Sequence, residues 1–143
     1  MKDLKEHEQI CIEKYNKYAN DAYDGQLKGL FTQIAQTEQQ HLDTINQIMS
    51  GTIPAMQQGE GEQVQLSFNP VYSSDASDPN KQKDSYLCTD LLSTEKHVSS
   101  VYNTAVFEFK DTNIRKILNH IQKEEQQHGE QIYNYMAQNG MYS

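Results

Sequence analysis

The sequence predicts an all-α fold, a four-helix bundle built from two repeated antiparallel helical hairpins that one long crossover linker joins. Apolar residues recur every three or four positions on both sides of a central irregular stretch, which is the period of amphipathic helices. All three prolines lie within that stretch, and the two flanking parts of the chain align with each other. A length of 143 residues suits a single domain with one core.

The central stretch, at about 51–84, is predicted to be an irregular linker. It contains Pro54, Pro70 and Pro79 together with Gly, Ser and Asp residues, which favour turns and loops. Helices are expected at about 2–23, 26–50, 85–109 and 112–138. The single domain 1–143 then consists of hairpin 1 at about 2–50, the linker at about 51–84 and hairpin 2 at about 85–138.

The two hairpins resemble each other in sequence. Residues 3–49 align without a gap onto residues 90–136, and the matches include polar residues that a shared helical pattern alone would not produce. This alignment indicates an internal duplication. The identical pairs are Asp3/Asp90, Leu4/Leu91, Glu8/Glu95, Tyr15/Tyr102, Asn16/Asn103, Asp24/Asp111, Ile34/Ile121, Glu38/Glu125, Gln39/Gln126, Gln40/Gln127, His41/His128, Ile45/Ile132 and Met49/Met136.

Acidic residues interrupt the apolar stripes of all the predicted helices. The second and fourth helices each carry a Glu-x-x-His motif within a stripe, and the first and third each carry a single Glu between apolar residues. Unpaired carboxylates are too costly to bury unless cations or protons neutralise them, and two divalent ions would balance four such charges. The predicted metal ligands are Glu8, Glu38, His41, Glu95, Glu125 and His128.

The spacing of these ligands predicts two equivalent half-sites. Glu and His at i and i+3 lie on one helix face, so they can present an oxygen and a nitrogen to the same ion. Glu8 and Glu38 lie at about the same height on either side of the turn near Asp24, and the repeat places the second set in the same register. The two half-sites should face each other across the bundle as a dinuclear site. They are Glu8 with Glu38 and His41, and Glu95 with Glu125 and His128.

Two further pairs of repeated residues lie close to the predicted ligands. Tyr15 and Tyr102 could hydrogen-bond a ligand or shuttle an electron, but ordinary core tyrosines are the favoured interpretation. Asp3 and Asp90 could orient a ligand histidine by accepting its second N–H. For Asp3, placement of a negative charge at a helix N-terminus is an equal alternative.

Several residues that could bind a metal are expected to lie outside the site, because they have no like counterpart in the other half. They are His7, His97, His120, Glu13 and Glu124. Cys11 and Cys88 form no C-x-x-C pair and cannot make a metal knuckle on their own. A reducing cytosol is the simplest interpretation of these cysteines, and a single disulfide between them stays an alternative.

The charge balance limits the classes of partner. Twenty acidic residues against 12 basic ones give a formal net charge of −8, which argues against nucleic acid and against an anionic membrane surface. No apolar run approaches bilayer length, and the first residues lack the apolar core of a signal peptide. A cytoplasmic protein is therefore expected.

The pattern of ligands resembles that of a known superfamily. One Glu from each of two helices plus a Glu-x-x-His from each of the other two is the ligand set of the ferritin-like di-iron and di-manganese carboxylate proteins. The chain also resembles the coat F family of spore coat proteins, whose members have this ferritin-like fold. That resemblance covers about 80–143 directly and 3–49 through the repeat. Its matching stretches are 90–96, 102–103, 113–116, 124–128 and 136–142.

The two resemblances imply different functions. The first implies a dinuclear metalloprotein with a ferroxidase or peroxide-consuming oxidoreductase capacity, similar to rubrerythrins but without the paired C-x-x-C motifs of a rubredoxin module. Hard carboxylate and imidazole ligands favour iron, with manganese or zinc as alternatives. The expected partners are a metal ion or a small-molecule oxidant, and a homodimer stays open. The second resemblance implies a structural protein of the spore coat, whose metal site is a relic or a staple.

Overall fold

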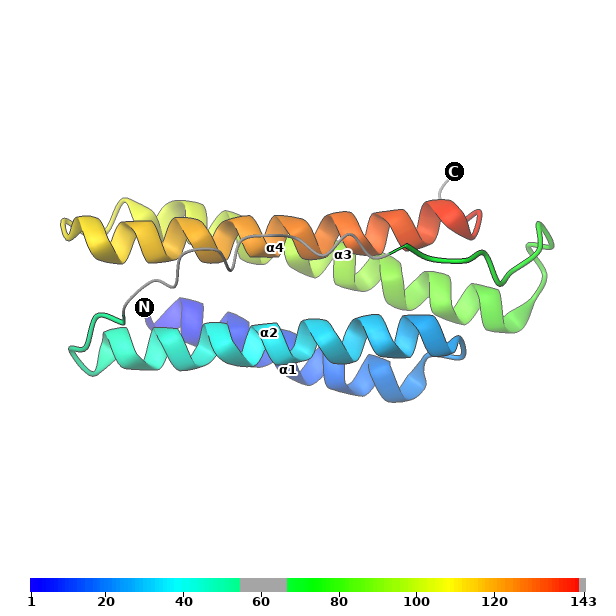
Figure 1. The fold of residues 1–143 in the computed structure, drawn as a ribbon, viewed down its shortest axis with the longest axis horizontal. Helices are drawn as coiled ribbons and strands as arrows, with labels where there is room; N and C mark the ends of the chain where they lie inside the picture. The colour runs from blue at the N-terminus through cyan, green and yellow to red at the C-terminus, as the bar shows by residue number, and fades with distance from the viewer. Residues whose placement is uncertain (55–66, 142–143) are drawn as a thin grey trace.

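Four helices run along one long axis in the computed structural model, which describes residues 1–54 and 67–141 (Figure 1). The helices are α1 (Lys2–Asp21), α2 (Gly25–Met49), α3 (Pro79–Val106) and α4 (Thr112–Gln138). α1 packs on α2 and α3 packs on α4, while α1 also contacts α3 and α2 contacts α4. The prediction of an all-α bundle made of two antiparallel hairpins is confirmed.

The connection between the hairpins has to cross the whole bundle. α2 ends at the left of Figure 1 and α3 begins at the right, so the chain between them travels the length of a helix. For the 25 residues of α2 this length is roughly 38 Å. The predicted linker at 51–84 includes residues 55–66, which lie outside the described residues. Because the connection is a crossover, each pair of neighbouring helices is antiparallel (Figure 1).

The third helix begins at Pro79, whereas the sequence predicted its start at about 85. The side chain of Asp78 caps this helix by accepting hydrogen bonds from the backbone N–H groups of Asn80 and Lys81, at 2.9 and 3.4 Å. Proline suits the first turn of a helix because its missing N–H would have no intrahelical partner there. Pro79 therefore starts the helix and does not belong to the irregular linker.

Buried Asp84 connects three segments of the chain at one end of the bundle through hydrogen bonds. This residue was placed in the linker by the sequence, but it lies in α3 and is fully buried. Its carboxylate accepts hydrogen bonds from the backbone N–H groups of Tyr23 and Asp24, at 2.8 and 3.0 Å, and from the hydroxyl of Tyr72. The turn between α1 and α2, the end of the linker and the start of α3 are thereby held together, since a buried carboxylate without such donors would be costly.

The core is formed by the apolar stripes that the sequence predicted. Tyr15, Phe31, Leu91 and Ile132 are among its fully buried side chains. Cys11 and Cys88 are also fully buried and both are free, so the alternative of a disulfide is wrong. Burial raises the pKa of both thiols, and nearby carboxylates raise it further, so both stay protonated at neutral pH.

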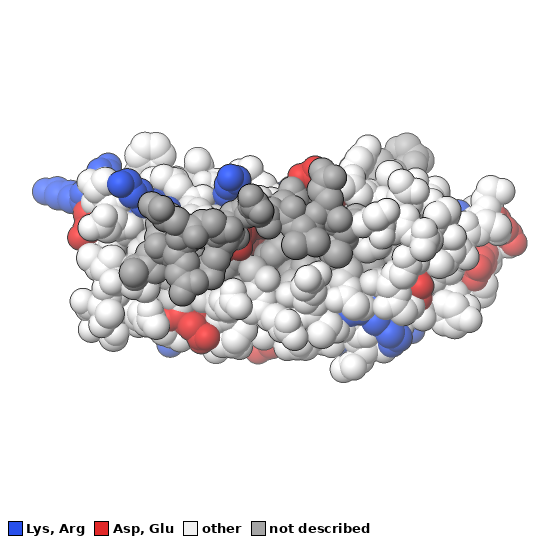
Figure 2. Space-filling model, in the orientation of Figure 1, with Lys and Arg blue, Asp and Glu red and all other residues white. Residues whose placement is uncertain are grey.

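The surface carries charges of both signs. Figure 2 shows acidic and basic side chains interspersed on the face toward the viewer, among many residues of neither kind. Within 1–54 and 67–141, no helix has both the length and the apolar character that a bilayer crossing requires.

Candidate metal centre

The six predicted ligands all point into the interior of the bundle. None of them is more than 6% exposed, and three of the four carboxylates are completely buried. Each of the four helices contributes one of these carboxylates, because each Glu lies on the stripe that faces the other helices. The glutamates and histidines are Glu8 on α1, Glu38 and His41 on α2, Glu95 on α3, and Glu125 and His128 on α4.

These side chains form two overlapping groups whose potential ligand atoms lie within 4.8 Å of one another. One group consists of Glu8, Glu38, His41 and Glu125, and the other of Glu38, Glu95, Glu125 and His128. The carboxylates of Glu38 and Glu125 are common to both groups. The sequence predicted two separate half-sites, and it missed that each hairpin also contributes a carboxylate to the half-site of the other.

Each of the two buried imidazole rings contacts a carboxylate of the other hairpin. His41 Nδ1 lies 2.8 Å from Glu125 Oε1, and His128 Nδ1 lies 2.9 Å from Glu38 Oε1. The two rings are stacked, with their centroids 6.1 Å apart. Both Nδ1 atoms therefore face the carboxylates in the centre of the bundle, where a nitrogen ligand would be needed.

Two buried tyrosines each donate a hydrogen bond to a glutamate of the other hairpin. The hydroxyl of Tyr15 donates a hydrogen bond of 2.6 Å to Glu95 Oε1, and the hydroxyl of Tyr102 donates one of 2.6 Å to Glu8 Oε1. The favoured interpretation of these residues as ordinary core tyrosines is wrong, because each positions a carboxylate of the opposite hairpin. The sequence could not show this crossing, since it depends on how the hairpins face each other.

Each of the four glutamates has one buried oxygen without a hydrogen-bond partner among the described residues. These atoms are the Oε2 atoms of Glu8, Glu38, Glu95 and Glu125. Buried polar atoms are nearly always paired, and each exception needs an explanation. Two divalent cations between the carboxylates would pair these oxygens and balance the four negative charges. The residues present therefore fit a dinuclear metal centre, with hard oxygen and imidazole donors suited to iron or manganese.

Burial and neighbouring charges perturb the pKa values of three of these carboxylates. Burial raises the pKa of Glu8 to about 8, with a further increase from Glu38 beside it. Burial likewise raises the pKa of Glu125, and repulsion from Glu95 adds to this effect. The pKa of Glu38 lies well below its usual range: burial alone would raise it, but the neighbouring Glu8, His128 and His41 side chains outweigh that cost.

Glu124 is a residue of the site that the sequence reasoning missed. Its Oε1 lies 3.0 Å from His41 Nε2 and 3.3 Å from His120 Nε2. Burial lowers the pKa of the His41 imidazole, but hydrogen bonds to Glu124 and Glu125 raise it well above its usual range. A carboxylate on the outer nitrogen of a metal-ligating histidine fixes the orientation of its ring. The repeat gave no signal here, because the counterpart of Glu124 is Thr37.

Asp3 and Asp90 do not orient a ligand histidine, although the sequence suggested this role for them. Asp90 accepts hydrogen bonds from the Lys14 ammonium and the Tyr18 hydroxyl, at 3.2 and 2.7 Å, and none from a histidine. Asp3 is exposed in the first turn of α1, where its charge suits the helix N-terminus. The suggestion that these residues orient a ligand histidine is therefore wrong, because Asp90 bonds to two side chains of α1 and Asp3 is exposed.

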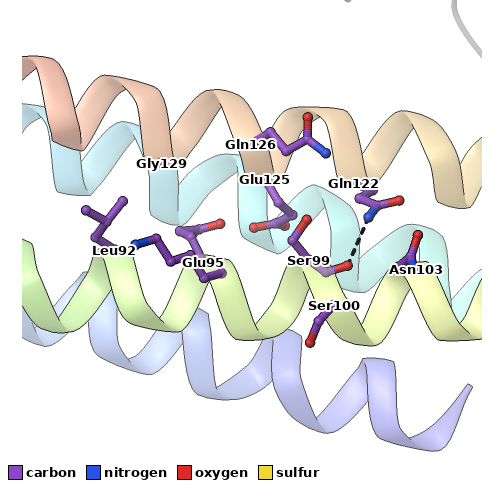
Figure 3. Close-up of a pocket in the computed structure, with 10 residues that line it drawn as sticks. Leu92, Glu95, Ser99, Ser100, Asn103, Gln122, Glu125, Gln126 and Gly129 are labelled. Atoms are coloured by element: carbon purple, nitrogen blue, oxygen red, sulfur yellow. Dashed lines mark hydrogen bonds between the residues drawn. The ribbon is translucent and has the colours of Figure 1, made fainter.

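A pocket of about 510 Å³ lies between α3 and α4, next to this centre (Figure 3). Buried Glu95 and Glu125 line its inner end, and exposed residues such as Ser100 and Gln126 line its outer part. Gln122 donates a hydrogen bond of 3.0 Å across the pocket to the backbone oxygen of Ser99. Two of the predicted ligands are thus adjacent to this pocket.

Comparison with known proteins supports one of the two resemblances. Residues 83–143 match the family model described as the Coat F domain. The matched part covers α4 and most of α3, and therefore Glu95, Glu125 and His128. The predicted resemblance to the coat F family is confirmed over these residues. Neither the curated proteins nor the solved structures that were compared with the chain gave a match.

Proposed function

We propose that this chain is a structural, spore-coat-associated protein with a ferritin-like bundle that binds two divalent metal ions between its helices. The Coat F match supports the association with the spore coat. Four buried carboxylates, each with an unpaired oxygen, carry the proposal of a metal centre. Glu38 and Glu125 would bind both ions. Glu8 and His41 would complete the ligands of one ion, and Glu95 and His128 those of the other.

A metal centre of this kind would stabilise the bundle. Its ligands come from all four helices, so the ions would tie the two hairpins together at the level where the carboxylates repel one another. A ligand that binds only the folded protein increases the free energy of unfolding. A coat protein would gain stability from metal ions that hold its two hairpins together, even if the metal centre catalysed no reaction.

Metal content is the first test of this function. Protein purified from iron- or manganese-supplemented medium should retain about two ions per chain after passage over a chelating resin, since two complete ligand sets are present. Elemental analysis by mass spectrometry measures this ratio. Fewer than one ion per chain under both conditions contradicts the proposal, and absence of the chain from coat extracts of purified spores contradicts the coat assignment.

The second candidate function is that of an oxidoreductase acting on ferrous iron, dioxygen or peroxide. Iron or manganese held by carboxylates and imidazoles supplies redox capacity. The observation that favours this candidate is the pair of buried phenols, because Tyr15 and Tyr102 each lie 2.6 Å from a carboxylate of the centre. A phenol so close to a ligand can supply a proton or an electron.

An activity assay separates the two candidates. Stopped-flow measurements on metal-loaded protein should follow ferrous iron oxidation and peroxide consumption, with the variant Glu38→Gln/Glu125→Gln as the control. If the oxidoreductase function holds, the wild type turns over and the variant does not. Inertness of the fully loaded wild type in both assays leaves the structural function as the conclusion.

A further inference from the structure

We infer that divalent ions reach the candidate metal centre through the pocket between α3 and α4, and that the absence of a side chain at Gly129 keeps this route open. The inference rests on the proposed metal-binding function. Figure 3 shows Glu95 and Glu125 facing each other across the pocket from α3 and α4. Both residues are at most 2% exposed, so they lie buried behind its inner wall.

The pocket has room for a hydrated cation. A pocket of about 510 Å³ can hold several water molecules, each of which occupies about 30 Å³. Ser99, Gln122 and Asn103 line it with hydroxyl and amide groups that can replace water around an ion. The unpaired Oε2 atoms of Glu95 and Glu125 attract a cation at the inner end. The exposed Lys96 near the outer part opposes this attraction only weakly, because solvent screens its charge.

The internal repeat shows how the two hairpins differ at this place. Gly129 corresponds to Leu42, and the polar residues Ser99 and Gln122 correspond to Ile12 and Ala35. Leu42 is 9% exposed, so its side chain is buried in the first hairpin. The second hairpin therefore has smaller residues at Gly129 and Ser99, and polar residues at Ser99 and Gln122, where the first hairpin has apolar ones. This asymmetry favours the second hairpin as the side from which ions enter.

Gly129 is a suitable place to close the route. A Cβ atom built there would lie 3.6 Å from Leu92 Cδ1, which is an ordinary van der Waals contact. A longer side chain would extend into the pocket that Leu92 and Gly129 both line. The glycine lies inside α4 and has no positive φ, so its backbone accepts other residues. Replacement by a better helix former also removes the conformational cost of a glycine inside a helix.

The test compares the rate of metal uptake by Gly129→Leu with that of Gly29→Leu. Gly29 also lies inside a helix, α2, but it is exposed and a Cβ there meets no atom within 4 Å. It therefore receives the same side chain away from the pocket. Apoprotein is mixed with Co²⁺ in a stopped-flow instrument, and the visible absorbance of the bound ion gives the rate. A separate equilibrium titration gives the number of ions bound.

Uptake by Gly129→Leu should be at least about tenfold slower than uptake by the wild type, with the same number of ions bound at equilibrium. Gly29→Leu should take up ions as fast as the wild type. The rate for Gly129→Ala should lie between those of the wild type and Gly129→Leu. Equal rates for all these proteins at full occupancy overturn the route but leave the metal centre intact. If the wild type itself binds no Co²⁺, the proposed function fails and the route fails with it.

Discussion

The variant Glu38→Gln/Glu125→Gln should bind neither of the two metal ions. Both carboxylates belong to both groups of ligand atoms, so each potential ion loses two charged ligands at once. Glutamine preserves the shape of the side chain but provides a neutral and much weaker donor for a divalent cation. Elemental analysis after reconstitution should therefore find no more metal than in chelator-treated wild type.

Single variants distinguish the carboxylates that belong to one group of ligand atoms from those that belong to both. Glu8→Gln should weaken binding of one ion and Glu95→Gln that of the other, because each carboxylate belongs to one group only. The loss of affinity should exceed the roughly 10–100-fold that the loss of an outer partner of a ligand causes. Titration with Mn²⁺ should then show one tight site in each single variant.

A surface variant controls for the change in charge. Glu6 and Glu130 are exposed on α1 and α4, and Glu6→Gln/Glu130→Gln alters the net charge by the same amount as the double variant of the centre. This control should bind as much metal as the wild type. Far-UV circular dichroism should show the same helical content for all variants. Two ions retained by a well-folded Glu38→Gln/Glu125→Gln protein would contradict the proposed centre.

The fold and the six candidate ligands followed from the sequence because both depend on local periodicity. The register of Glu38 with His41 is set by one helix, and that of Glu8 with Glu38 by one hairpin. The repeat then transferred the same arrangement to the second hairpin. Such relations need only the helical period and the position of a turn.

Relations between the hairpins did not follow from the sequence. The hydrogen bond from Tyr15 to Glu95 and the sharing of Glu125 with the first group depend on which faces meet across the bundle. Glu124 could not be found by the repeat, since Thr37 occupies its place in the other half. The start of α3 at Pro79 was missed because a proline marks a helix start as well as a loop.

The stabilisation that metal gives should increase with pH between about 6 and 8. In the metal-free protein, burial raises the pKa of Glu8 from its ordinary value of 4.5 to about 8. Between these values the folded protein binds more protons at Glu8 than the unfolded chain, so its stability falls as pH rises. Hydrogen bonds to carboxylates also raise the pKa values of His41 and His128, despite burial, and this stability is lost as pH rises above 6.5.

The lowered pKa of Glu38 acts outside this window. Its folded value lies below its ordinary value of 4.5, so the stability it contributes is complete at pH 6 and is lost only in acid. The raised pKa values of Glu8, His41 and His128 therefore all change the stability of the metal-free protein in one direction. Metal ions require deprotonated carboxylates and neutral imidazoles, so they compete with the same protons.

Thermal unfolding with and without Mn²⁺ measures this competition. If binding displaces one net proton per chain, the stabilisation by metal is about 2.7 kcal/mol larger at pH 8 than at pH 6. The increment in Tm should then be roughly 5–10 °C larger at the higher pH. Glu38→Gln/Glu125→Gln should show no increment at either pH. An increment that is independent of pH, or that persists in this variant, would mean that Mn²⁺ binds elsewhere, because ions at the buried carboxylates cannot bind without releasing protons.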